Sequence, residues 1–134
     1  MERGHTELRV WVNGTFDVLH RGHVELLTYA SKFGKVRVGI DYDERVKSLK
    51  GETRPINQWN DRRFFMESII HVDSVVGFGS DEELENQIKE WNPDILVVGS
   101  EYETKEVIGG QFAKQVIFFP KVGEFSTTKI LRDR

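Results

Sequence analysis

Short runs rich in β-branched residues alternate along this chain with segments of helical periodicity, and this alternation limits the fold more than any other feature. The runs expected to be strands are 8–12, 36–40, 74–78, 95–98 and 115–119. The segments expected to be helices are 23–33, 43–49, 58–70, 81–91 and 126–132. Because parallel strands need crossover connections, this order predicts an α/β, Rossmann-like doubly wound sheet. We expect about five mainly parallel strands with helices on both faces.

The predicted parallel sheet also indicates where a ligand-binding site would lie. The run 95–98 is wholly apolar, as is typical of a central strand covered on both faces. Ligands of such sheets bind beyond the carboxyl ends of the strands. Functional residues are therefore expected just after Val12, Ile40, Val98 and Phe119.

Composition excludes several classes of protein. The 134 residues carry 19 Lys and Arg against 22 Asp and Glu, without the basic surplus of a general nucleic-acid binder. The absence of cysteine excludes disulfides, cysteine metal sites and thiol catalysis. No apolar run approaches the ~20 residues of a membrane span, and the first residues lack the apolar centre of a signal peptide. We expect one cytoplasmic domain over 1–134, with 1–7 a flexible tail and no nucleic-acid or membrane partner.

The first expected strand runs into Asn-Gly-Thr-Phe-Asp-Val-Leu-His-Arg-Gly-His, at 13–23. Gly14 permits a tight turn or the close approach of a ligand. His20, Gly22 and His23 lie where a helix begins, and the free N–H groups and dipole of a helix start attract phosphate. In the alternative interpretation His20 caps the helix and His23 packs against the sheet. Metal binding is disfavoured, because no third His or Cys lies nearby.

This segment resembles the signature of the HxGH nucleotidyltransferases, in particular their cytidylyltransferase-like family, and the resemblance extends over about 8–132. The family includes glycerol-3-phosphate cytidylyltransferases and heptose 1-phosphate adenylyltransferases. The resemblance implies that His20 and His23 are catalytic, near the α-phosphate, and that Asp17 lies in the substrate site. It implies nucleotide contacts from Asn13, Gly14, Thr15, Phe16 and Gly22.

A basic loop, Lys-Ser-Leu-Lys-Gly-Glu-Thr-Arg-Pro at 47–55, follows the second expected strand. Ammonium and guanidinium groups suit phosphate oxygens, although an ordinary solvated loop has the same composition. The Leu-Lys-Gly-x-x-Arg-Pro pattern is similar to the corresponding loop of heptose adenylyltransferases. The resemblance implies a catalytic Lys50 and substrate contacts from Lys47, Arg54 and Arg62. On the helix that contains Arg62, we expect the core residues to be Phe64, Phe65, Ile69 and Ile70.

Two further motifs follow later strands. After 95–98 come Gly99 and Glu101, for which nucleotide contacts and a plain polar turn are both open; relatives usually have Asp where Glu101 stands. Ser-Thr-Thr-Lys at 126–129 resembles the phosphate-binding segment of the family, although helix capping alone would explain its hydroxyls. The resemblance implies a catalytic Lys129 and nucleotide contacts from Ser126, Thr127 and Thr128.

Together these motifs predict nucleotidyl transfer with pyrophosphate release. ATP with a heptose-like sugar 1-phosphate is favoured over CTP with glycerol 3-phosphate or a similar polyol or amino-alcohol phosphate. A non-catalytic nucleotide-binding module is the alternative of another class. The resemblance implies Mg²⁺ bound with the nucleoside triphosphate, no metal ligands from the protein, and a homodimer.

Overall fold

The computed structural model of the chain describes residues 7–99 and 106–120. The expected helix at 126–132, Glu101 and residues 1–6 of the tail expected at 1–7 lie outside the described residues. The strands are β1 (Leu8–Gly14), β2 (Gly34–Asp41), β3 (Ser74–Phe78), β4 (Ile95–Gly99) and β5 (Gln115–Phe119). The helices are α1 (Arg21–Ser31), α2 (Asp43–Lys50), α3 (Trp59–Glu67), α4 (Asp81–Trp91) and the short 3-10 helix η3 (Gly110–Phe112).

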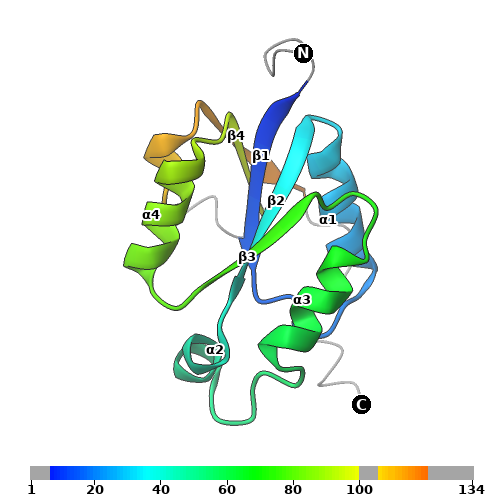
Figure 1. Cartoon of the computed structure of the whole chain (residues 1–134), viewed down its shortest axis with the longest axis vertical. Coiled ribbons are helices and arrows are strands. Elements are labelled where there is room, and N and C mark those ends of the chain that lie inside the picture. The colour runs from blue at the N-terminus through cyan, green and yellow to red at the C-terminus, as the bar shows by residue number, and fades with distance from the viewer. Residues whose placement is uncertain (1–6, 100–105, 121–134) are drawn as a thin grey trace.

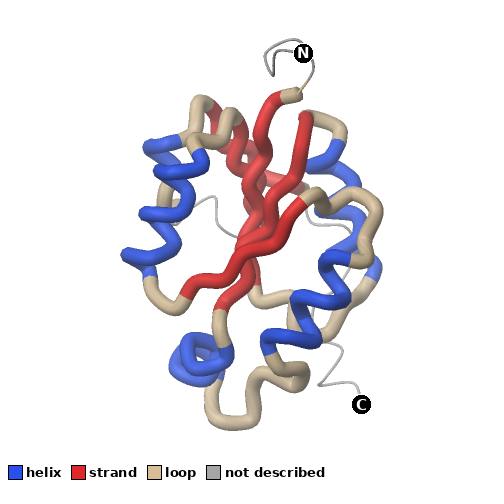
Figure 2. The backbone as a smooth tube through the Cα atoms, viewed as in Figure 1, coloured by secondary structure: helices blue, strands red, loops and turns tan. Residues whose placement is uncertain are grey.

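The strands form one sheet in the order β3-β2-β1-β4-β5, and every neighbouring pair is parallel. Figures 1 and 2 show this sheet between helices, with α4 on one side and α1 and α3 on the other. The predicted fold class is therefore confirmed. The chain moves outward from β1 to β3 and then returns to place β4 beside β1. Such a reversal of strand order is where doubly wound sheets bind ligands, at the carboxyl ends of the strands.

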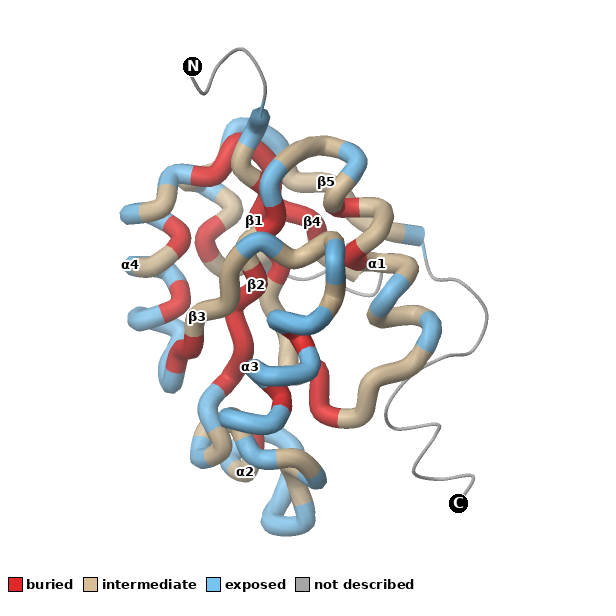
Figure 3. Tube along the Cα trace, turned by 45° about the vertical axis from the view of Figure 1, so that its right-hand side comes forward, coloured by how far each residue is buried: buried red, intermediate tan, exposed pale blue. Residues whose placement is uncertain are grey.

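The two faces of the sheet have separate cores, because successive side chains of a strand point to opposite sides. In β1, Val10 and Val12 belong to the core with Leu27 of α1 and Met66 of α3. Trp11 lies between them in sequence and belongs to the other core. Figure 3 shows that burial is concentrated in the strands and on one side of each helix. The buried members of the second core are Trp11, Phe78, Leu84, Ile88 and Leu96.

The expectation for the core face of the helix at 58–70 is wrong for three of its four residues, and this helix, α3, already ends at Glu67. Exposed in the structure are Phe64, Phe65 and Ile70, whereas Ile69 packs against the core. The side of the helix that faces the sheet instead carries Trp59, Arg62 and Met66, and Ile69, just past the helix end, packs against the same core. These positions recur every three or four residues, as one face of a helix requires. Because one of them is a charged residue, hydrophobicity alone pointed to the wrong face.

The ends of α4 follow from local side-chain chemistry. Ser80 caps the helix, since its Oγ accepts a hydrogen bond from the Glu83 N–H at 3.1 Å. The Glu83 carboxylate accepts from the Gly79 N–H, one residue before the Ser80 N–H that a reciprocal capping box would use. Asn92 ends the helix in the left-handed conformation, at φ 55°, directly before Pro93.

Gly39 in β2 leaves the space that the buried Trp11 ring of β1 occupies. A Cβ atom at position 39 would lie 2.6 Å from Trp11 Cζ2. We expect Gly39→Ala to lower the free energy of unfolding by about 1–3 kcal/mol in urea titrations, because the buried ring has to move. Gly79→Ala is the control: its Cβ would meet Tyr42 at an ordinary 3.5 Å. Equal losses in the two variants would contradict this account.

Candidate functional site

Two histidines are fixed at the start of α1 by the backbone of the helix itself. His20 is the N-cap residue, and its Nδ1 accepts a hydrogen bond from the Gly22 N–H at 3.0 Å. His23 reaches back, and its Nδ1 accepts from the His20 N–H at 3.3 Å. The two rings are stacked, with centroids 3.8 Å apart and planes at 23°. The capping interpretation of His20 is therefore correct, and both imidazoles are held at a helix N-terminus.

This capping geometry determines which ring nitrogen of each histidine carries the proton. A neutral imidazole whose Nδ1 accepts a hydrogen bond has its proton on Nε2. Burial, together with the charges of His20 and Lys50, lowers the pKa of His23 to about 4. Burial also lowers the pKa of His20. At neutral pH the pair therefore consists of neutral Nε2–H donors in the positive potential of a helix start, suited to binding phosphoryl oxygens without transferring a proton.

The low pKa of His23 makes stability depend on pH. The residue titrates near 6.5 when unfolded and at about 4 when folded, so between these values the unfolded state binds more protons. The contribution of this group is fully present above about pH 6.5, and its loss as the pH falls to about 4 amounts to at most ~3 kcal/mol. Urea titrations across this range should show a steeper decline for the wild-type protein than for His23→Gln. Parallel curves would contradict the lowered pKa.

The turn after β1 is shaped by its own aromatic residue. Phe16 adopts a left-handed backbone conformation, at φ 49°, and is buried. A Cβ atom at Gly14 would lie 3.1 Å from Phe16 Cε2, so the glycine makes room for this ring. The ring meets the His23 ring edge-on, with centroids 5.2 Å apart. Asn13 accepts a hydrogen bond from the Trp11 indole at 3.0 Å. Phe16 thus packs against one ring of the histidine pair.

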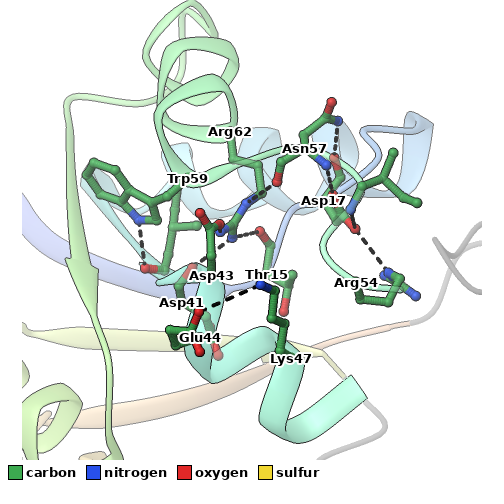
Figure 4. A network of polar contacts seen from close by, with 12 residues as sticks. Thr15, Asp17, Asp41, Asp43, Glu44, Lys47, Arg54, Asn57, Trp59 and Arg62 are labelled. Atoms are coloured by element: carbon green, nitrogen blue, oxygen red, sulfur yellow. Dashed lines mark hydrogen bonds and ion pairs between the residues drawn. The ribbon is translucent and has the colours of Figure 1, made fainter. Parts of the chain in front are cut away.

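Asp17 joins this turn to the loop that follows α2. Its carboxylate is fully buried and accepts hydrogen bonds from Arg54 Nε at 3.0 Å, from the Ile56 N–H at 2.8 Å and from the Asn57 N–H at 2.8 Å. In return, the Asn57 side-chain amide donates to the Asp17 carbonyl at 2.6 Å. Figure 4 shows these contacts converging on the carboxylate. In this structure Asp17, expected in the substrate site, is surrounded by groups of its own chain.

Arg62 is the centre of a second buried network, visible in Figure 4. Its side chain is fully buried. Nε donates to the Asn57 carbonyl at 2.9 Å, Nη1 to the carbonyls of Thr15 at 3.0 Å and Asp41 at 2.8 Å, and Nη2 to the Asp43 carboxylate at 2.7 Å. The guanidinium thus connects α3 with the segments that follow β1 and β2. The structure does not place it on a surface that a substrate reaches.

Sequence reasoning missed two acidic residues at the carboxyl end of β2, Asp41 and Asp43. Asp41 is buried and accepts a hydrogen bond from Arg45 Nε at 3.1 Å, and Arg45 also pairs with Asp81. Burial raises the pKa of Asp41, against the opposing effect of Arg45. Asp43 is the partner of Arg62. The available signal was their position, since Asp41 is the last residue of a parallel strand and Asp43 lies two residues further on.

The basic loop brings one lysine to the histidine pair. Lys50 ends α2, and its charge contributes to the lowered pKa of His23, so the two side chains lie near one another. Lys47 is more exposed and forms an ion pair with Glu44 at 3.7 Å. Gly99, at the end of β4, pairs with Phe119 of β5. Outside the described residues lie the other expected site residues, Glu101, Ser126, Thr127, Thr128 and Lys129.

The described part of the chain offers neither a cluster of metal ligands nor a membrane-spanning helix. Within 7–99 and 106–120, no group of three or more His, Asp or Glu side chains is placed to hold a metal ion. Over the same ranges, no helix has the length and apolar character needed to cross a membrane.

The sequence profile of the cytidylyltransferase-like family matches residues 11–132, so this chain belongs to that family of nucleotidyltransferases. Within the family it is similar to the bifunctional protein HldE of several bacteria. The identity is 43% over 123 residues with the protein of Campylobacter fetus, 46% over 123 residues with that of Nitratiruptor and 40% over 132 residues with that of Helicobacter pylori. These matches cover 91%, 91% and 98% of this chain, but only 27%, 26% and 28% of the relatives. The chain thus spans about a quarter of their length.

Solved structures show the same fold at lower identity. A lipopolysaccharide core biosynthesis protein from Thermoplasma volcanium superposes with a TM-score of 0.68 at 22% identity, over 90% of this chain and 99% of that one. Pantothenate synthetase from Thermus thermophilus superposes with a TM-score of 0.64 at 14% identity, over 96% of this chain and 63% of that one. At these identities the likeness concerns the fold alone.

Proposed function

We propose that this chain is a sugar-phosphate adenylyltransferase, which transfers AMP from ATP to a heptose-like sugar 1-phosphate and releases pyrophosphate. The observation that carries the proposal is the identity of 40–46% with HldE proteins over nearly the whole chain. The Leu-Lys-Gly-x-x-Arg-Pro loop of this chain, similar to that of heptose adenylyltransferases, favours the same choice. A cytoplasmic location and a homodimer belong to the same proposal.

The proposed reaction needs no nucleophile from the protein. A phosphate oxygen of the acceptor forms a bond to the α-phosphorus of ATP, and the bond from that phosphorus to the bridging oxygen breaks. Pyrophosphate leaves with the electron pair, and Mg²⁺ enters as part of the MgATP substrate. The task of the chain is to hold two anions together and to stabilise the charge that develops between them. Neutral imidazoles at a helix start, with Lys50 beside them, suit that task.

The remaining site residues take their roles from this reaction. His20, His23 and Lys50 act at the α-phosphate, together with Lys129. Nucleotide contacts are assigned to Asn13, Gly14, Thr15, Phe16, Gly22, Gly99, Glu101, Ser126, Thr127 and Thr128. Lys47 and Arg54 bind phosphate groups of the substrates. Arg62 supports the turn at Thr15 through its carbonyl contacts instead of binding substrate.

Pyrophosphate release tests the proposal. ATP and CTP are each combined with sugar 1-phosphates, glycerol 3-phosphate and amino-alcohol phosphates, with MgCl₂ throughout. We expect release with ATP and a heptose 1-phosphate. Release with CTP and glycerol 3-phosphate would replace the proposal by the cytidylyltransferase alternative. Binding of ATP without release for any acceptor would indicate a non-catalytic nucleotide-binding module.

A further inference from the structure

The Arg54 guanidinium is held in the site with one of its donor atoms unused. Its side chain is only 11% exposed, and its Nε is committed to Asp17 at 3.0 Å. Nη2 is buried, and no acceptor for it is found in 7–99 or 106–120. A buried guanidinium N–H without an acceptor costs free energy, which an anionic ligand would recover.

Asp17 determines where this donor points. Its carboxylate is fully buried and is also anchored by the backbone N–H groups of Ile56 and Asn57, two and three residues beyond Arg54. A guanidinium is planar and rigid, so fixing Nε also fixes the direction of both Nη groups. Asp17 therefore sets both the course of the loop and the orientation of the Arg54 side chain.

The surroundings indicate what the free donor would bind. Asp17 stands three residues before His20, in the turn that leads into α1. Lys50, four residues before Arg54, is close enough to His23 to lower its pKa. The loop therefore brings positive charge to the turn before α1 through Arg54 and to His23 through Lys50, and a phosphoryl group is the ligand that such charge and N–H donors suit.

We propose that Asp17 is a positioning residue, which holds Arg54 so that Nη2 binds a phosphoryl oxygen of one of the two substrates. Asp17 itself does not contact substrate, in contrast to the role that the resemblance implies. This inference rests on the proposed function, since it takes both substrates to be phosphorylated. It leaves two sources for the anion, the nucleoside triphosphate and the acceptor phosphate, which the experiment separates.

Steady-state kinetics of Arg54→Gln, Asp17→Asn and the double variant test the proposal. We expect Arg54→Gln to raise KM for one substrate about 10–100-fold, the worth of a hydrogen bond to a charged group, with a much smaller change in kcat. The substrate whose KM rises is the source of the anion. Asp17→Asn should raise the same KM, and the double variant should be no worse than Arg54→Gln. Arg63→Gln, on the exposed side of α3, is the control and should leave both KM values unchanged.

Additive effects on KM, or a rise in the other substrate's KM with Asp17→Asn, would overturn the positioning role. A rescue experiment separates this role from mere loop stability. Millimolar guanidinium chloride should restore part of the lost activity to Arg54→Ala, where Asp17 remains to orient it. It should not restore activity to Asp17→Asn/Arg54→Ala. Equal rescue of both would contradict the proposal.

A binding measurement keeps the inference testable if the chain transfers no nucleotide. Calorimetric titrations with ATP and with inorganic phosphate need no turnover. Arg54→Gln should weaken the binding of one of these anions at least about 10-fold, and Asp17→Asn should weaken the same one. Unchanged affinities for both anions would overturn the positioning role. A wild-type protein that binds but does not turn over would instead refute the proposed function.

Discussion

His20→Asn is expected to lower kcat by about 10²–10³-fold while leaving thermal stability nearly unchanged. Asparagine is a good N-cap residue, so its side-chain oxygen can accept the hydrogen bond that the Gly22 N–H now donates to His20 Nδ1. The substitution therefore keeps the helix start and removes the Nε2–H donor, together with the ring that stacks on His23. Removing one such donor at a centre of developing charge typically costs a factor of this size. Pyrophosphate release and thermal unfolding measure the two effects.

His20→Ala is the matched comparison. It lacks both the donor and the cap, so we expect the same loss of kcat together with a loss of about 1 kcal/mol of unfolding free energy. If turnover persisted in His20→Asn and fell only in His20→Ala, His20 would act only as the N-cap of α1 and not in catalysis.

The second large effect is expected from Arg62→Met, which should lower the free energy of unfolding by about 3–5 kcal/mol. Methionine fills much of the same volume, but the carbonyls of Thr15, Asp41 and Asn57 lose their buried donor. Arg62 connects the segments after β1 and β2, so their loosening should also reduce activity. Urea titration measures the loss of stability.

Arg63→Met is the control for Arg62→Met, one position further along α3. Arg63 is about half exposed and pairs with Glu67 at 3.1 Å, an exposed contact worth at most ~1 kcal/mol. If the two variants lost similar stability, the buried network would not be what holds these segments together.

The sequence was sufficient for the sheet, because strand patterns depend on local alternation and apolar runs. The bounds of β3 and β5 were predicted as the structure has them, and the crossover argument predicted parallel pairing. The core face of α3 could not be predicted in this way. Its central position is Arg62, whose burial depends on carbonyls from segments up to 47 residues away. Hydropathy treats a charged residue as exposed, and only the fold supplies its partners.

Local spacing was likewise enough to locate the histidine pair but not to describe its chemistry. The pattern of two histidines around a glycine placed both at a helix start, as the structure shows. The lowered pKa of His23 depends on burial and on Lys50, far away in sequence. The Asp17 cluster joins residues 37–40 positions apart, and no local pattern reveals such a contact. Motifs could therefore name Asp17 and Arg54 but could not show that one holds the other.

The most direct test of the central claim follows the phosphorus atoms of ATP through the reaction. Wild-type protein is incubated with a heptose 1-phosphate and MgATP labelled at either the α- or the γ-phosphate, and the products are separated. The account predicts that the α-label enters a nucleotide sugar and that the γ-label leaves in pyrophosphate. Transfer of the γ-label to the sugar phosphate, or no labelled product under conditions where ATP binds, would contradict it.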